Sequence, residues 1–348
     1  MEAHQPPVLG TPPKQSLKLS NPYLDTLLLQ YESEIQALLN MSATPGAAVA
    51  IVKDSSIVFL KGFGVKAVDT NDSVDANTVF RLASVSKCFA SFLTGILIED
   101  SLMTWGDPVV SYLPDFTLRS PEQTKLLNLQ HVLSHSTGLP YHAYTNLVEE
   151  GKDIDFLLES LKEVKLASNV GKEYSYQNVA YSIIGEVIKE ATGKPYQLQM
   201  LEKVFLPLHM KNASIDYSSL IANPNIAKPH QMRNRGWRTA TITDTYYNVA
   251  PAGGVNASAA DMAQWMIALL GYRPDIIAPK TLAHLYTPVV PAPSKNRNYG
   301  RRHRLSRSFY GLGWRVLHYP NDTLIYHGGY VNGYRSEVAF DPNDQIAI

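Results

Sequence analysis

The chain has 348 residues, of which 45% are apolar and 18% charged, and its 31 basic side chains balance 31 acidic ones. At roughly 150 residues per domain, this length predicts about two domains with a sizeable core. The zero formal net charge disfavours a general nucleic-acid binder. The longest apolar stretch, Phe89 to Ile98, is much shorter than the roughly 20 residues of a membrane-spanning helix, so we expect a soluble protein without an integral membrane span. A single cysteine, Cys88, excludes an internal disulfide and a cysteine-based zinc cluster.

The N-terminal part of the chain predicts a tail, a helix and two strands. Residues 1–22 carry five prolines without apolar periodicity, which indicates an extended or mobile tail. No signal peptide is visible, so we expect a cytoplasmic protein or a mature form. Leu24 to Leu39 has helical periodicity. The apolar runs Gly46 to Lys53 and Ile57 to Phe63, separated by polar residues, predict a β-hairpin.

Helical patterns fill the middle of the chain. Apolar residues recur at helical spacing from Ser84 to Glu99, and Ser84 occupies the position of a capping hydroxyl. Asn178 opens a second helix that ends at Gly193. A third begins at Ser258 with Asp261 three residues on, which is a capping-box pattern, and ends near Gly271.

Strand patterns return at the C-terminal end, at 323–330, 334–340 and 345–348. Strands at both ends with helices between them predict an α/β (α+β) fold, with an antiparallel sheet flanked by helices and an inserted, mainly helical domain. The expected domains are 23–105 together with 256–348 for the sheet, and 106–255 for the helices. We expect the active site between the two.

Several common catalytic signatures are absent. No serine has a glycine two residues before it, and no Walker A or GxGxxG string occurs. His131 and His135 have the i, i+4 spacing of a metal site, but Val132 follows the first histidine where a metalloprotease needs a glutamate. We therefore expect neither a metal nor an organic cofactor.

The string Arg81-Leu82-Ala83-Ser84-Val85-Ser86-Lys87 contains the chain's one Ser-x-x-Lys pattern. Residues three apart share a helix face, so Lys87 would lie within reach of the Ser84 hydroxyl. Serine needs such a base, and lysine can serve if burial lowers its pKa. Apolar residues follow Lys87 directly, which favours a buried, functional lysine over a surface one. Cys88 is expected to be a small core residue.

Two further strings are candidates. Tyr-x-Asn occurs at five places, of which Tyr176-Gln177-Asn178 stands in a polar loop before a helix and could face a cleft. Alternatively, Asn178 caps that helix and Tyr176 packs beneath it. His327-Gly328-Gly329-Tyr330 lies inside a predicted strand, where paired glycines indicate close approach of a ligand or of another backbone segment, or else a bulge.

Together, these strings resemble the serine β-lactamase and penicillin-binding protein superfamily, in the branch of class C β-lactamases, D-peptidases and related esterases. Supporting segments are Ser134 to Pro140, Tyr112 to Pro114, Pro251 to Gly254 and Tyr310 to Trp314. The resemblance covers about residues 30–348. It implies a β-lactamase/transpeptidase-like fold.

The resemblance assigns a role to each residue. Ser84 would be the acylated nucleophile, Lys87 its base, and Tyr176 a proton relay to the leaving group. Asn178 would contact the substrate amide, and His327 would stand where a lysine or histidine borders the site. The backbone N–H groups of Ser84 and Tyr330 would form the oxyanion hole, with Gly328 and Gly329 admitting the substrate.

Two departures from the family bear on the activity. His327-Gly328-Gly329 replaces the Lys-Thr-Gly of class C β-lactamases, so an often neutral imidazole takes the place of the cation that engages a β-lactam carboxylate. The chain stops at Ile348 where the family usually adds a helix, which indicates truncation or an uncovered sheet face.

The expected function is a serine hydrolase acting through an acyl-enzyme on a β-lactam, a D-peptide or an ester. An esterase of the same fold, or a catalytically weak scaffold at the cell envelope, is the alternative. Family habit implies a periplasmic or secreted location. The segment Ser294 to Ser308 has six basic and no acidic residues, which predicts a solvated loop or one that steers anionic substrates.

Overall fold

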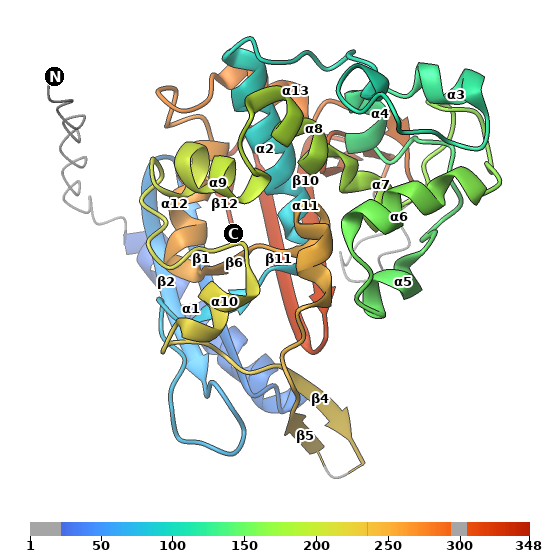
Figure 1. The fold of residues 1–348 in the computed structure, drawn as a ribbon. Helices are drawn as coiled ribbons and strands as arrows, with labels where there is room; N and C mark the ends of the chain where they lie inside the picture. Colours follow the sequence, from blue (N-terminus) through green and yellow to red (C-terminus); the bar gives the residue numbers. More distant parts are fainter. Residues whose placement is uncertain (1–21, 235, 294–304) are drawn as a thin grey trace, which may run out of the picture.

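A computed structural model describes residues 22–234, 236–293 and 305–348 of the chain (Figure 1). The predicted N-terminal tail, apart from its last residue, and most of the predicted basic segment lie outside these residues. Within them, the predicted fold class is confirmed, with one large antiparallel sheet and helices that cover it. The predicted domain boundaries stay a prediction.

The main sheet joins strands from both ends of the chain. Its order is β2-β1-β12-β11-β10-β9-β8-β7, and every neighbouring pair is antiparallel. The strands are β1 (Gly46–Lys53), β2 (Ser56–Gly64), β7 (Val290–Pro291), β8 (Arg307–Tyr310), β9 (Arg315–Tyr319), β10 (Asp322–Val331), β11 (Tyr334–Asp341) and β12 (Ile346–Ala347). The predicted hairpin and the predicted C-terminal strands are therefore confirmed. Strand β12 pairs with β1 and so joins the N-terminal hairpin to the C-terminal strands.

Two smaller sheets complete the strands. β3 (Val79–Arg81) pairs with β6 (Asn256–Ser258), and β4 (His230–Arg233) forms a hairpin with β5 (Gly236–Thr239). The first of these pairs brings the segment before Ser84 beside the start of the predicted helix at Ser258.

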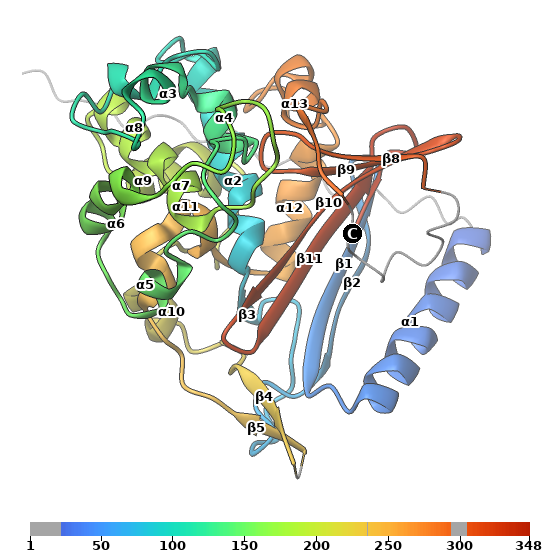
Figure 2. The same ribbon diagram turned by 90° about the vertical axis from the view of Figure 1, so that its right-hand side faces the viewer.

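Helices lie on both faces of the main sheet (Figure 2). Helix α1 stands alone on one face, whereas α2 and α12 cover the other, with the helices of the middle of the chain beyond them. The helices are α1 (Pro22–Ser42), α2 (Ser86–Glu99), α3 (Pro121–Leu126), α4 (Leu129–Leu133), α5 (Thr145–Glu149), α6 (Ile154–Ser160), α7 (Asn178–Tyr181), α8 (Ile183–Thr192), α9 (Tyr196–Met200), α10 (Tyr217–Ala222), α11 (Ala250–Gly253), α12 (Ala259–Leu269) and α13 (Pro279–Leu285). None of the described helices is long and apolar enough to cross a membrane.

Helix α2 is the centre of the core, as its apolar sequence predicts. Every residue from Ser86 to Leu97 is buried. Phe89 stacks on Trp265 of α12 at a ring distance of 3.9 Å, and Trp265 stacks on Trp314 at 5.8 Å. Trp314 in turn meets Phe340 of β11 edge to face. Because such aromatic contacts bury large areas, this row fixes α2 between α12 and the sheet.

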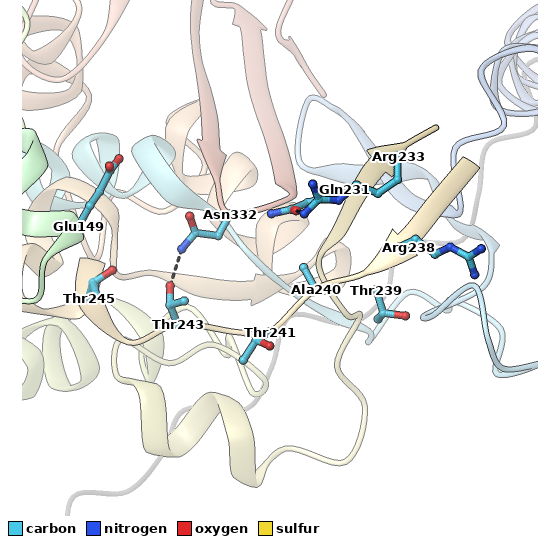
Figure 3. Close-up of a pocket in the computed structure, with 10 residues that line it drawn as sticks. All are labelled: Glu149, Gln231, Arg233, Arg238, Thr239, Ala240, Thr241, Thr243, Thr245 and Asn332. Carbon is cyan, nitrogen blue, oxygen red and sulfur yellow. Dashed lines mark hydrogen bonds between the residues drawn. The ribbon is translucent and has the colours of Figure 1, made fainter. Parts of the chain in front are cut away.

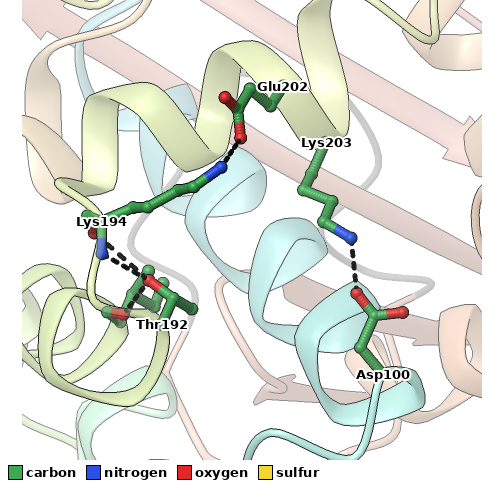
Figure 4. Close-up of polar contacts among 6 residues, drawn as sticks. Asp100, Thr192, Lys194, Glu202 and Lys203 are labelled. Atoms are coloured by element: carbon green, nitrogen blue, oxygen red, sulfur yellow. Dashed lines mark hydrogen bonds and ion pairs between the residues drawn. The ribbon is translucent and has the colours of Figure 1, made fainter. Parts of the chain in front are cut away.

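One exposed ion pair lies at the far end of α2, and a second lies close to it (Figure 4). Lys203, in the π-helical turn η4 (Leu201–Phe205), pairs with Asp100 just after α2 at 2.7 Å, and Lys194 pairs with Glu202 at 2.7 Å. All four side chains are substantially exposed. Pairs of this kind contribute about 0–1 kcal/mol each, so the aromatic row dominates the placement of α2.

The predicted capping role of Ser84 is wrong. Ser84 lies inside a 3₁₀ turn, η1 (Ala83–Val85), and α2 begins two residues later with Val85 as its N-cap and no side-chain cap. Because Ser84 lies in this 3₁₀ turn and not at the N-cap of α2, its hydroxyl makes no capping hydrogen bond to the backbone of α2.

The predicted capping box at the start of α12 is confirmed, and it yields a stability test. The Ser258 hydroxyl accepts from the N–H of Asp261 at 3.2 Å, and the Asp261 carboxylate accepts from the N–H of Ser258 at 2.9 Å, both buried. Ser258→Ala should lower the free energy of unfolding in urea by about 1–2 kcal/mol, because a buried donor loses its partner. An unchanged unfolding midpoint would contradict this role.

Candidate active site

Lys87 is the most deeply buried ionisable side chain of the predicted site, with 0% relative exposure. Its Nζ lies 2.9 Å from Oδ1 of Asn178, 2.9 Å from the carbonyl oxygen of Ala252, and 3.5 Å from Oγ of Ser84. The structure therefore brings together Ser84, Lys87 and Asn178, as the sequence predicts, and adds the carbonyl of Ala252.

The electrostatics of this pocket favour a neutral amine. Burial lowers the pKa of Lys87 well below the usual 10.5, and the positive charge of Arg315 acts in the same direction. A neutral amine has two hydrogens and one lone pair. Both close oxygens can only accept, so they take the two hydrogens and leave the lone pair for the Ser84 hydroxyl. This is the arrangement that a general base needs, although the 3.5 Å contact must shorten for proton transfer.

Ser84 is half-buried and is held by the strands beside it. The preceding Ala83 has a φ of +48°, a region that residues with a Cβ rarely adopt. Leu82 compensates on both sides: its N–H donates to Val255 at 2.8 Å, and its carbonyl accepts from the Ser336 hydroxyl at 2.6 Å. Strained backbone of this kind is found at functional sites when neighbouring bonds enforce it.

Tyr176 and Asn178 reach the lysine from the segment before α7 and from its first residue, respectively. Tyr176 is 7% exposed, and its ring centre lies 4.7 Å from Nζ of Lys87. Burial raises the pKa of Tyr176, and the proximity of Ser84 offsets part of that rise. Asn178 is the first residue of α7 and Gln177 is the N-cap, so the Asn178 side chain serves Lys87 and does not cap the helix.

His327 lies on β10 with both ring nitrogens engaged. Nδ1 is 2.8 Å from the carbonyl of Gly328, and Nε2 is 3.0 Å from the hydroxyl of Tyr310. Because a carbonyl only accepts, Nδ1 carries the hydrogen. Burial, followed by the charges of Arg315 and Lys87, lowers the pKa of His327 well below 6.5, so the ring is neutral and accepts from Tyr310.

The two strand glycines differ in their surroundings. A Cβ on Gly329 would meet the carbonyl oxygen of Leu82 at 2.3 Å and the nitrogen of Ser84 at 3.0 Å, whereas a Cβ on Gly328 would meet nothing closer than 3.7 Å. The β10–β11 register runs without a break from Ile325 to Val331, so no bulge explains them. The predicted close approach of another backbone segment is thus found at Gly329. Tyr330, the next residue, is 70% exposed at the rim.

The sequence analysis considered His135 only as a metal ligand and did not single out Arg315, although both lie in this cluster. The His135 ring centre lies 4.3 Å from that of Tyr176, with the two rings tilted. His135 accepts from the N–H of Gln177 at 3.2 Å and leaves Nε2 buried without a partner. Arg315, at the start of β9, lies 5.9 Å from the ring centre of Tyr176. The sequence signal that could have identified Arg315 is its position between Trp314 and the apolar residues Val316 and Leu317, where a charged residue is unusual.

A polar cavity of about 570 Å³ lies apart from this cluster, and none of the predicted site residues lines it (Figure 3). It lies between Glu149 of α5, the β4–β5 hairpin and Asn332, whose side chain is hydrogen-bonded to Thr243. The carbonyl of Thr243 accepts from Arg81, three residues before Ser84, at 2.7 Å.

No cluster of potential metal ligands occurs among the residues that the structure describes. His131, one of the two histidines at metal-site spacing, accepts through Nδ1 from the N–H of Asn128 at 3.3 Å as part of a capping box.

Comparison with known proteins gives a consistent picture. The protein-family model described as Beta-lactamase matches residues 32–348. The chain is 24% identical over 339 residues to the unguisins hydrolase ungD' of Aspergillus campestris, covering 93% of this chain and 61% of that protein. It is 26% identical over 344 residues to Beta-lactamase-like protein 4 of Dictyostelium discoideum, covering 91% and 58%. The chain thus spans about three fifths of the length of these relatives.

Among solved structures, the octameric penicillin-binding protein homologue from Pyrococcus abyssi has a similar fold. The TM-score is 0.78 at 21% identity, over 92% of this chain and 72% of that one. At this identity the likeness concerns the fold.

The contrast between the two glycines gives a matched test. Gly329→Ala should displace the Ser84 turn, cost about 1–3 kcal/mol of folding free energy and slow labelling of Ser84 by a fluorophosphonate about 10²-fold, because the added methyl group overlaps a carbonyl oxygen. Gly328→Ala is the control, with the smaller effect on both measurements because its Cβ has space. Equal effects of the two variants would show that the contact at Gly329 is not decisive.

Proposed function

The chain belongs to the β-lactamase family, and from this premise we propose that it is a serine hydrolase that works through an acyl-enzyme on an amide or ester. The observation that carries the proposal is the buried Lys87, whose two acceptor contacts leave its lone pair for Ser84. The hydrolase named among its relatives supports the reaction class.

In the proposed acylation, Lys87 takes the proton of the Ser84 hydroxyl while Oγ attacks the substrate carbonyl carbon. The backbone N–H groups of Ser84 and Tyr330 would hold the developing oxyanion, each such donor contributing about 10²–10³ in rate. The bond to the leaving nitrogen or oxygen then breaks, and Tyr176 relays the proton to it. Water hydrolyses the Ser84 ester in the second step, which restores the hydroxyl and releases the acid.

We place amide substrates of the β-lactam or D-peptide type ahead of simple esters. Lys87 contacts only Oδ1 of Asn178, so the two hydrogens on Nδ2 of Asn178 are left to donate to a substrate carbonyl. The esterase alternative is supported by His327, because both of its ring nitrogens already have partners and the neutral ring offers no positive charge to a β-lactam carboxylate. A catalytically weak scaffold has less support, since Ser84, Lys87 and Tyr176 are together.

Intact-protein mass spectrometry after addition of a penicillin tests the proposal. Wild type should gain the mass of the opened β-lactam, transiently if the drug is consumed or persistently if deacylation is slow, and Ser84→Ala should gain none. Short p-nitrophenyl esters provide the second arm. If wild type and Ser84→Ala behave alike with both reagents, Ser84 is not the nucleophile.

The pH dependence tests the base. The neutral form of Lys87 is the active one, so kcat/KM should rise with pH along a limb set by its lowered pKa, far below 10.5. Asn178→Asp places a negative charge 2.9 Å away, which favours the ammonium and should move this limb to higher pH.

Asn169→Asp, on an exposed loop, is the charge-matched control and should leave the limb in place because solvent screens it. A limb that moves equally in both variants, or in neither, would contradict the assignment of Lys87 as the base.

A further inference from the structure

The end of β10 carries one of the two N–H groups of the proposed oxyanion hole. Strand β9 pairs with β10 over residues 322–326, and residues 327–331 pair with β11 and with no other described strand. The second edge of this stretch is therefore open. Val331 and Tyr334 face each other across a two-residue turn, so the alternation of an antiparallel pair directs the N–H of Tyr330 to the open edge. The position of this donor thus depends on contacts from outside the sheet.

One threonine connects the β10–β11 turn to the segment of the nucleophile (Figure 3). The turn residue Asn332 donates through Nδ2 to Oγ1 of Thr243. The backbone carbonyl of the same Thr243 accepts from Nη1 of Arg81 at 2.7 Å. Arg81 is the last residue of β3 and stands three residues before Ser84. We call these two hydrogen bonds the Thr243 link, because they join the strand that leads to Ser84 to the hairpin that bears Tyr330.

Arg81 is a fixed end of this link. Its side chain is 0% exposed, and its guanidinium lies 4.6 Å from the ring centre of Tyr247. The hydroxyl of Tyr247 donates to Asn256 of β6 at 2.7 Å, and β6 pairs with β3. Nε and Nη2 of Arg81 are buried and meet no partner in the part of the chain that the structure describes. Burying a cation with so few partners is costly, so its bond to Thr243 calls for a functional explanation.

The hairpin turn at the other end of the link is short and regular. Asn332 and Gly333 have φ values of +42° and +93°, and a type I′ turn requires positive φ at both of its central residues. The carbonyl of Gly333 accepts from the N–H of His230 at 3.3 Å, and the hydroxyl of Tyr334 donates to the carbonyl of Ala227 at 2.8 Å. These bonds keep the hairpin folded when the Thr243 link is removed, so the loss falls on its exact placement.

We propose that Thr243 is a positioning residue that fixes the N–H of Tyr330 relative to the N–H of Ser84, so that both meet the same oxyanion. Thr243 acts through Asn332 and touches no reacting atom. Oxyanion donors lower the barrier only when they are already in place, and a misplacement of about 1 Å costs on the order of 10² in rate. The inference rests on the proposed function, because it names a residue that places the donors of the same site.

Thr243→Val tests the role, because valine keeps the shape and the backbone carbonyl of Thr243 but removes Oγ1. The rate constant for labelling of Ser84 at saturating fluorophosphonate should fall about 10–100-fold, with little change in the affinity for the reagent. Thr243→Ser restores the hydroxyl and should recover most of the rate. Thr241→Val, the same substitution at an exposed residue of the same segment, is the matched control and should label at the wild-type rate.

The pH profile separates a misplaced donor from a general loosening of the site. The labelling rate of Thr243→Val should fall by the same factor at every pH, because the link acts on the oxyanion donors and not on Lys87. A pH limb that moves together with the rate would overturn the proposal. So would a Thr243→Ser variant that labels as slowly as Thr243→Val.

A double-mutant cycle tests whether Thr243 acts through Asn332. Asn332→Gly removes the donor and tolerates the positive φ of the turn. If the two residues form one link, Thr243→Val in the Asn332→Gly background should cause no further loss of rate. Effects that multiply in the double variant would contradict the link.

Hydrogen exchange followed by mass spectrometry separates this inference from the proposed function, because it requires no reaction. Peptides covering residues 329–336 should exchange faster in Thr243→Val than in wild type, and those covering 315–319 should not change. If wild type is not labelled at Ser84 while exchange changes in this way, the acyl-enzyme proposal fails and the Thr243 link is supported. If wild type is labelled and Thr243→Val is labelled equally fast, the positioning role fails whatever the exchange shows.

Discussion

The structure around Ser84 depends on keeping a lysine amine buried and uncharged. Transferring an ammonium group out of water is so costly that the group loses its proton instead, and a neutral amine then needs acceptors for its two hydrogens. The side chain of Asn178 and the carbonyl of Ala252 supply them. These two residues lie far apart in the sequence, so the base exists only when α2, α7 and α11 are packed together.

This requirement explains why the core is built around α2. The aromatic row from Phe89 through Trp265 and Trp314 locks the helix against α12 and the sheet, and the Lys87 side chain on this helix is fully buried. The strands then approach from the other side, where the absence of a side chain at Gly329 lets β10 come within contact of Leu82 and Ser84. The packing of α2 and β10 therefore fixes the positions of the Ser84 hydroxyl and the Lys87 amine relative to each other.

Much of this architecture could be predicted from the sequence. Short apolar runs separated by polar residues identified the hairpin, strand patterns identified the C-terminal strands, and the apolar run after Lys87 identified a buried helix. Local patterns did not reveal the 3₁₀ turn at Ser84, because the left-handed φ of Ala83 is imposed by the bonds of Leu82 to Val255 and Ser336. Arg315 belongs to no motif, and its position among three tyrosines arises from contacts between distant segments.

The most direct test of the account is the ionisation of Lys87 itself. Lysine labelled with ¹³C at Cε and ¹⁵N at Nζ allows each amine to be titrated by NMR, and the Lys87→Met variant assigns the signal. We expect one lysine to be neutral at pH 7 and to titrate far below the usual 10.5, while the exposed lysines titrate normally. If every lysine signal, including that of Lys87, titrates near 10.5, Lys87 is protonated at neutral pH and cannot be the base for Ser84.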